Sequence, residues 1–194
     1  MSEHSFSYVL RHTQMRPRQL IILCNEIAEC AIKSRNFPRF SESDIRAGIA
    51  AGEVKLASEI LNAYAKMFPN AGRIIKVLSG LPMVFKGNEL DRRAHESAAH
   101  WKNGTYTNSL FIDLVVQLGV VGRVRRSSGE GHHNVEFQYA QESDLLLSHR
   151  DDCAIHPMFF SKIGIIPESR CIIHPYRDSS VDDSWLQAGS LLHT

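Results

Sequence analysis

The sequence predicts an α+β fold that is mainly α-helical, with a helical lid-like bundle followed by a domain that carries one small β-hairpin. Apolar residues recur at helical spacing through most of residues 16–118. Strict alternation of apolar and polar residues is confined to two short stretches on either side of the glycine-bearing loop 127–133. With 194 residues, 43% of them hydrophobic, the chain can bury one or two modest cores.

The first predicted helix opens at Arg16–Pro17–Arg18, because proline lacks an N–H that the first turn of a helix would leave unpaired anyway. Its expected apolar face consists of Leu20, Leu23, Cys24, Ile27, Ala28 and Ala31. Residues 1–15 are polar and mixed, with no predicted element. Residues 1–15, this helix and the next helix together form a predicted helical domain over residues 1–68.

The second predicted helix begins at Ser41 and runs to about Met67. Ser41 and Asp44 have the spacing of a capping box, with aspartate in place of the usual glutamate. Gly48 and Gly52 are expected to break this helix in two, since glycine weakens a helix interior.

Residues 69–140 predict helix, strand, helix, helix and hairpin in one pass. The helices are expected at 70–79, 89–100 and 107–118, and the first strand at 83–85. The hairpin joins a strand over 120–125 to a return strand in which Val135, Phe137 and Tyr139 share one face. This order is that of a winged helix, a module that binds DNA or protein and rarely catalyses a reaction. The winged-helix domain is expected over 69–165.

A buried strand leading into a short helix is predicted over residues 153–160. Residues 166–194 read as a polar, acidic C-terminal tail, in which Cys171 to Ile173 could add a strand. Residues 177–194 are expected to be loosely ordered.

Charge and cysteine usage exclude few partners. The formal net charge is +1, and a dedicated nucleic-acid binder is usually more basic. The four cysteines are scattered without C-x-x-C spacing, so a reduced, cytoplasmic location is expected. The N-terminus has no long apolar run, which predicts neither a signal peptide nor a membrane partner.

Motifs for catalysis are missing, so we expect this chain not to be an enzyme. It contains no P-loop motif, because Gly129–Glu130–Gly131 lacks a following helix and lysine, and therefore should not hydrolyse a nucleotide alone. It has no G-x-S-x-G or H-E-x-x-H pattern. For His132 and His133 a solvated wing tip is favoured over a metal site, and no metal is expected.

Arg123, Arg125 and Arg126 at the hairpin are candidate nucleic-acid contacts, because guanidinium groups bind DNA phosphates. They could equally be solvated charges that keep a strand edge from aggregating. The third helix of the module would normally enter the major groove. Its expected outward residues carry no positive charge and predict poor base reading: Thr107, Asn108, Asp113 and Gln117.

Arg16 and Arg18 are the second candidate site, because cations at a helix N-terminus oppose the helix dipole. An anion such as a nucleotide phosphate would compensate them, and simple solvation is the alternative. His156 is the third candidate, and a hydrogen-bonded core histidine is the alternative interpretation there.

The order of these motifs resembles the C-terminal half of P-loop ATPases of the AAA+/STAND group, which includes origin-recognition-like ATPases and a bacterial P-loop ATPase family. The resemblance covers residues 8–165 and rests on Arg16–Pro17–Arg18, the Ser41 helix start, the winged helix and Ile155–His156–Pro157. It implies that Arg18, with Arg16 beside it, senses nucleotide phosphates, that Pro17 packs near the adenine, and that His156 contacts bound ADP. Proline follows His156 where the family motif has aspartate.

The resemblance implies a non-catalytic regulatory or interaction region that couples the nucleotide state of an ATPase core to a partner through its winged helix. No cofactor is expected in this chain, and ATP or ADP with Mg would belong to the full-length ATPase. The expected partners are the missing ATPase core or another protein. The alternatives are a free-standing winged-helix transcriptional regulator that contacts DNA phosphates, and a protein-interaction module with no link to nucleotides.

Overall fold

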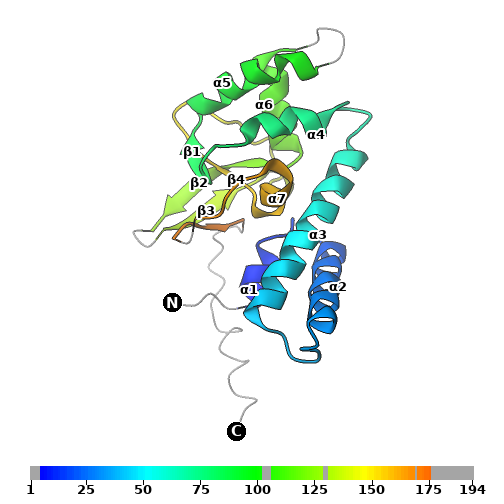
Figure 1. Ribbon diagram of the computed structural model, residues 1–194. Coiled ribbons are helices and arrows are strands. Elements are labelled where there is room, and N and C mark those ends of the chain that lie inside the picture. Colours follow the sequence, from blue (N-terminus) through cyan, green and yellow to red (C-terminus); the bar gives the residue numbers. More distant parts are fainter. Residues whose placement is uncertain (1–4, 102–105, 129–130, 169, 176–194) are drawn as a thin grey trace.

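The computed structural model describes residues 5–101, 106–128, 131–168 and 170–175, and it confirms an α+β fold (Figure 1). The N-terminal helices are α1 (Ser5–Leu10), α2 (Pro17–Lys33) and α3 (Glu42–Ala63). The helices that follow are α4 (Ala71–Ile74), α5 (Asn88–Ser97), α6 (Asn108–Gln117) and α7 (Phe160–Ile163), with short 3-10 turns η1 (Ile75–Leu78), η2 (Ala98–His100), η4 (Gln138–Ala140) and η5 (Pro157–Phe159). The strands are β1 (Val84–Lys86), β2 (Val121–Ser127), β3 (His132–Glu136), β4 (Asp152–Ile155) and β5 (Ile172–His174).

Residues 5–15 are more structured than the sequence suggested. After α1, the side chains of His12, Thr13 and Gln14 are buried. The Gln14 backbone N–H donates to Gln19 Oε1 at 2.7 Å, and its side-chain amide donates to the Leu118 carbonyl at 3.0 Å. Polar residues therefore anchor the N-terminal segment by hydrogen bonds, which a search for apolar periodicity cannot find.

The two long helices α2 and α3 pack closely as an antiparallel pair (Figure 1). The predicted break at Gly48 and Gly52 is wrong, because α3 is continuous through both. A Cβ atom on Gly48 would lie 2.5 Å from the Cα of Ile27, and one on Gly52 would lie 2.5 Å from Leu23 Cδ2. The glycines thus allow the two helix backbones to approach each other.

The start of α3 carries the predicted capping box. Ser41 Oγ accepts from the Asp44 backbone N–H at 3.1 Å, and Asp44 Oδ2 accepts from the Ser41 backbone N–H at 3.0 Å. The Asp44 carboxylate also accepts from Ser34 and Asn36 in the preceding loop. These side-chain hydrogen bonds, that of Ser34 foremost, lower the pKa of Asp44 well below its usual range. One carboxylate therefore fixes both the helix start and the loop from α2.

The predicted order of helix, strand, helix, helix and hairpin is present from α4 to β3. Thr107 is the N-cap of helix α6, and its hydroxyl accepts from the Leu110 backbone N–H at 3.1 Å. Its buried face is formed mainly by Phe111, Leu114 and Val115, whereas Leu110 is 36% exposed. Cys24 on α2 is likewise exposed rather than part of the apolar face.

The sheet is larger than the expected hairpin and has five strands in the order β1-β4-β2-β3-β5 among the described residues. Strand β4 lies between β1 and β2 and is antiparallel to both, with Ala154 opposite Val84 on one side and Gly122 on the other. Strand β5 adds a parallel edge beside β3. The return strand ends at Glu136, so Phe137 and Tyr139 lie beyond it. The end of the chain from 176 onward lies outside the described residues.

One apolar cluster extends from Val9 near the N-terminus to Ile173 in β5. Its largest fully buried side chains include Phe111, Phe137 and Phe159. Helix α3 contacts η5 and α7, and Figure 1 shows α7 between the sheet and α3. The helical part and the sheet therefore share a core, although the boundary expected at residue 68 stays a prediction.

We expect Gly48→Ala to destabilise the protein by about 1–3 kcal/mol, the usual cost of overpacking a close contact. The added Cβ would meet the Ile27 backbone, which cannot rotate away as a side chain can. Gly72→Ala is the matched control, because its Cβ would lie 3.6 Å from Leu61 Cδ1, an ordinary contact distance. Urea unfolding of both variants tests this, and equal stabilities would contradict the close approach of α2 and α3.

Candidate functional site

His156 follows β4 and is completely buried. Its Nδ1 accepts from the Met158 backbone N–H at 3.1 Å, so the ring caps η5. Its Nε2 lies 2.8 Å from the hydroxyl of Tyr139. The rings of Phe137, Tyr139 and Phe159 surround it. Both ring nitrogens are therefore engaged inside the protein, and neither faces solvent.

These contacts fix the protonation of His156. Since Nδ1 accepts a hydrogen bond, the neutral ring carries its proton on Nε2. Burial lowers the pKa of His156 to about 3, with a smaller contribution from the nearby His12. The ring is therefore neutral at physiological pH and belongs to the core. The geometry matches the alternative interpretation of a hydrogen-bonded core histidine.

A second buried polar cluster, missed by the sequence analysis, centres on Glu53 of α3. Glu53 Oε1 lies 2.6 Å from His12 Nδ1, and Glu53 Oε2 accepts from both the hydroxyl and the backbone N–H of Ser161 in α7. His12 and Glu53 are each about 5% exposed or less. A signal for it exists in the sequence, because Glu53 interrupts the apolar face formed by Ile49 and Leu56. The cluster joins the segment after α1 to α3 and α7; its His12 and Glu53 side chains are buried, whereas Ser161 is exposed.

The residues Arg16, Pro17 and Arg18 lie at the exposed start of α2. Arg16 occupies the N-cap position without a capping side-chain bond, and Pro17 begins the helix. Arg18 donates to Glu59 Oε1 of α3 at 3.2 Å, and its side chain is 79% exposed. The acid that compensates Arg18 is therefore supplied by the neighbouring helix. The structure does not bring Arg18 and His156 to a common open site, because His156 is sealed in the core.

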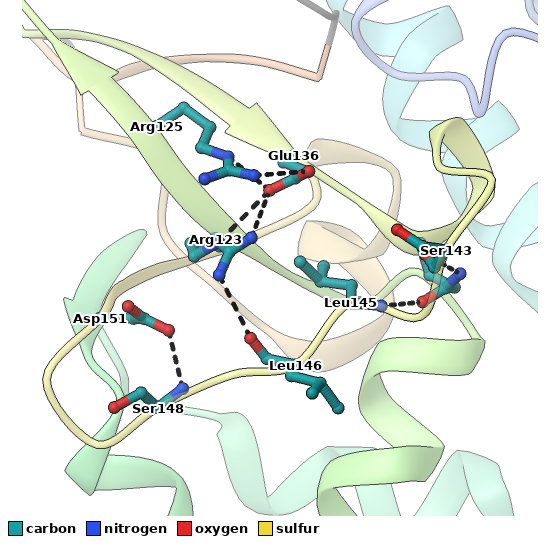
Figure 2. A network of polar contacts seen from close by, with 9 residues as sticks. Arg123, Arg125, Glu136, Ser143, Leu145, Leu146, Ser148 and Asp151 are labelled. Carbon is teal, nitrogen blue, oxygen red and sulfur yellow. Dashed lines mark hydrogen bonds and ion pairs between the residues drawn. The ribbon is translucent and has the colours of Figure 1, made fainter.

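Two of the three hairpin arginines bind one carboxylate (Figure 2). Glu136 Oε2 accepts from Arg123 Nη2 at 2.9 Å, and Glu136 Oε1 accepts from Arg125 Nη2 at 3.0 Å. Burial alone would raise the pKa of Glu136, but the hydrogen bonds from Arg125 and Arg123 outweigh it and hold the pKa below its usual value. Arg126 is exposed and lies opposite Asn134.

Arg123 also fixes the loop between η4 and β4. Arg123 Nη1 donates to the Leu146 carbonyl at 3.4 Å, as Figure 2 shows. Further along the loop, the Ser148 backbone N–H donates to Asp151 Oδ2 at 2.7 Å. The Leu145 N–H donates to Gln138 Oε1 at 2.6 Å. Arg123 thus has a structural role that occupies much of its hydrogen-bonding capacity.

Helix α6 offers no positive charge to a DNA groove. Thr107, Asp113 and Gln117 are exposed, as expected. Asn108 is partly buried, and its amide donates to Asp91 Oδ1 at 2.7 Å. Because Arg123 and Arg125 are also paired with Glu136, this surface is a weak match for a sequence-reading helix.

His132 and His133 lie at the start of β3, beside the loop residues 129–130 that are outside the described part of the chain. His132 Nδ1 lies 3.0 Å from Nε2 of His174 on β5, with the two rings stacked, and His133 Nδ1 lies 2.8 Å from Ser127 Oγ. Across the described ranges, no three His, Cys, Asp or Glu side chains are grouped to hold a metal ion. No helix in the described part of the chain is long and apolar enough to span a membrane.

Comparison with known proteins gives one similarity. Residues 1–52 match a family model described as a FunZ-associated C-terminal helical domain. This match covers α1, α2 and the first half of α3, about a quarter of the chain. No curated protein and no solved structure matches. The match points to a C-terminal domain of a larger protein, without specific support for the AAA+/STAND group.

We expect acid to destabilise the protein partly through His156. Its pKa is about 3 in the folded state and about 6.5 when unfolded, so the unfolded state binds the proton first. The contribution of the neutral, buried ring to the free energy of unfolding is therefore complete above pH 6.5. It is lost as the pH falls from there towards 3. His156→Asn keeps an acceptor for the Met158 N–H but cannot titrate.

His156→Asn should be less stable than the wild type at pH 8 by about 1–3 kcal/mol, because it loses the buried hydrogen bond to the Tyr139 hydroxyl. Its free energy of unfolding should also fall less steeply between pH 7 and pH 4. Denaturant unfolding across this range measures both. The exposed His100→Asn provides the control. Parallel profiles for the wild type and His156→Asn would show that His156 is not the titrating group.

We also expect weak, sequence-independent DNA binding that Glu136 suppresses. Glu136→Gln releases Arg123 and Arg125 from their shared carboxylate. Affinity for duplex DNA should rise, and its salt dependence should steepen by up to about 0.9 per additional phosphate contact. Fluorescence anisotropy over a salt series tests this against Glu142→Gln, an exposed site with the same charge change. Sequence-selective binding by the wild type would contradict the expectation.

Proposed function

We propose that this chain is a non-catalytic interaction region of a larger protein, and that α2 carries its main binding surface. The observation behind the proposal is an apolar stripe on the outward side of α2, formed by Ile21, Cys24, Ala28 and Ile32. Ile21 and Ile32 are 60% and 59% exposed. They are three helical turns apart and therefore lie on the same side of the helix.

The loop that leaves α2 adds two exposed aromatic side chains. Phe37 and Phe40 are 55% and 49% exposed and contact each other edge to face, with their ring centroids 6.1 Å apart. Single exposed apolar residues are ordinary, whereas a group aligned along one helix and its loop is typical of a binding surface. A partner would bury the stripe of α2 by laying an apolar surface against it.

The family similarity supports a choice of partner. The matched residues 1–52 include the whole stripe and both phenylalanines. The description of that family as FunZ-associated favours a FunZ polypeptide as the occupant of the stripe. The helices of this region would then serve as a docking element, and the sheet with its winged-helix-like order of elements would serve as its rigid support.

The finer form of the proposal follows the AAA+/STAND resemblance. In it, the partner is a P-loop ATPase core, and Arg16, Pro17 and Arg18 face the nucleotide of that core. The exposure of Arg18 supports this, since its guanidinium can exchange Glu59 for a phosphate at little cost. His156 has no part in it, because its ring is buried and engaged. Coupling would require contacts that differ between nucleotide states.

The test uses Ile21→Asp with Ile32→Asp and a separately purified FunZ polypeptide. The wild type should form a complex, and the double variant should bind at least about tenfold more weakly, a loss of ~1.4 kcal/mol. Because both side chains are exposed, the melting temperature should change by only a few degrees. Calorimetric titration measures the affinity.

Leu146→Asp with Ile166→Asp is the matched control, since these residues are 78% and 85% exposed and lie outside the matched region. The control should bind as the wild type does. Equal weakening by both double variants, or no complex with the wild type, would refute the assignment of the stripe.

A further inference from the structure

A second, independent surface feature is an open pocket of about 450 Å³ beside the C-terminal half of α3. Its walls come from three segments: residues 58–65 of α3 and its end, residues 68–76 through α4 and η1, and Lys162 of α7. Pockets of this volume fall within the range that holds small molecules.

The charged side chains of the pocket are all positive. Among the residues that the structure describes, Arg73, Lys76 and Lys162 line it, and no aspartate or glutamate does. Lys162 Nζ donates to the hydroxyl of Ser58, also a lining residue, at 3.3 Å. Within the described part of the chain, none of the three cations forms an ion pair. Elsewhere on the surface, arginines such as Arg46 and Arg92 do have acidic partners.

The lining is apolar away from the cations. Leu61 and Phe68 are 8% and 7% exposed and contribute to both the core and the pocket. Asn62 adds a neutral amide, and Asn70 contributes another whose Nδ2 already donates to the His100 carbonyl. The pocket therefore combines a positive rim with an apolar, partly aromatic wall.

We propose that this pocket binds a small organic phosphate. A phosphate monoester carries nearly two negative charges and three terminal oxygens, which the three cations that line this pocket can share. Arg73 suits two oxygens at once, and the two lysines act as point charges. The organic group lies against Leu61 and Phe68. The site uses side chains and is unrelated to a P-loop, so its existence does not depend on the interaction proposed for α2.

The probe is phenyl phosphate, added to the full ¹⁵N-labelled chain and followed by amide chemical shifts. Saturable shifts should appear at Gly72 and its neighbours. Phenol should produce none, because it lacks the anion. Inorganic phosphate should bind several-fold more weakly, because it leaves the apolar wall uncovered. Shifts with phenol, or equal affinity for inorganic phosphate, would overturn the proposal.

Arg73→Ala and Lys76→Ala should each weaken phenyl phosphate binding about tenfold, equivalent to ~1.4 kcal/mol. Lys66→Ala is the matched control, because Lys66 is exposed, close in sequence and outside the pocket. Melting temperatures should remain near that of the wild type for all three variants. Equal weakening by Lys66→Ala would show that the change in net charge alone causes the weaker binding, and it would overturn the proposed site. Binding of an octathymidylate without any binding of phenyl phosphate would assign the surface to a nucleic-acid strand and overturn it as well.

Discussion

The buried carboxylate of Glu53 constrains how the helical part and the sheet fit together. A charged or polar group removed from water is costly unless it finds hydrogen-bonding partners. Glu53 finds them in His12, before α2, and in Ser161, at the opposite end of the sequence. Helix α3 cannot bury this side chain unless both the N-terminal segment and α7 are docked against it. The apolar contacts around it then form a single cluster.

Shared carboxylates recur at two other places in the fold. Asp44 holds the loop between α2 and α3, and Glu136 holds two arginines of the hairpin. Asp44 receives donors from the loop between α2 and α3 and from the start of α3, whereas both donors to Glu136 come from β2. Charges that look like ligand contacts in the sequence are therefore partly used to hold the chain to itself. The pocket cations are an exception, since the described residues supply them with no acid.

Local sequence signals predicted the elements well and their pairing poorly. Pro17, the Ser41–Asp44 cap and the periodicity of Phe111, Leu114 and Val115 each act within a few residues, so the helices they define could be predicted. The continuity of α3 could not, because the role of Gly48 depends on Ile27, which lies on another helix. Propensity alone treats such a glycine as a break, whereas close helix packing makes it a requirement.

In the candidate sites too, the sequence predicted local features but not the distant partners of each residue. The exposure of Arg18 follows from its place at a helix start, but its partner Glu59 lies 41 residues away. Arg123 and Arg125 could be recognised as a cationic pair, but the strand register decides that Glu136 lies opposite Arg123. The pocket has no sequence motif, because Lys162 is nearly ninety residues from Arg73 and Lys76.

The position of β4 has a consequence for synthesis and truncation of this protein. Strands β1 and β2 are separated in the sheet by a strand that is translated after both of them. Until residues 152–155 leave the ribosome, each presents an unpaired edge, and such edges invite association with other chains. The pairing of Val84 with Ala154 closes a loop of about seventy residues, and contacts so distant in sequence slow folding. A chain ending at the hairpin would contain every element of the winged-helix order and yet lack the strand that makes them one sheet.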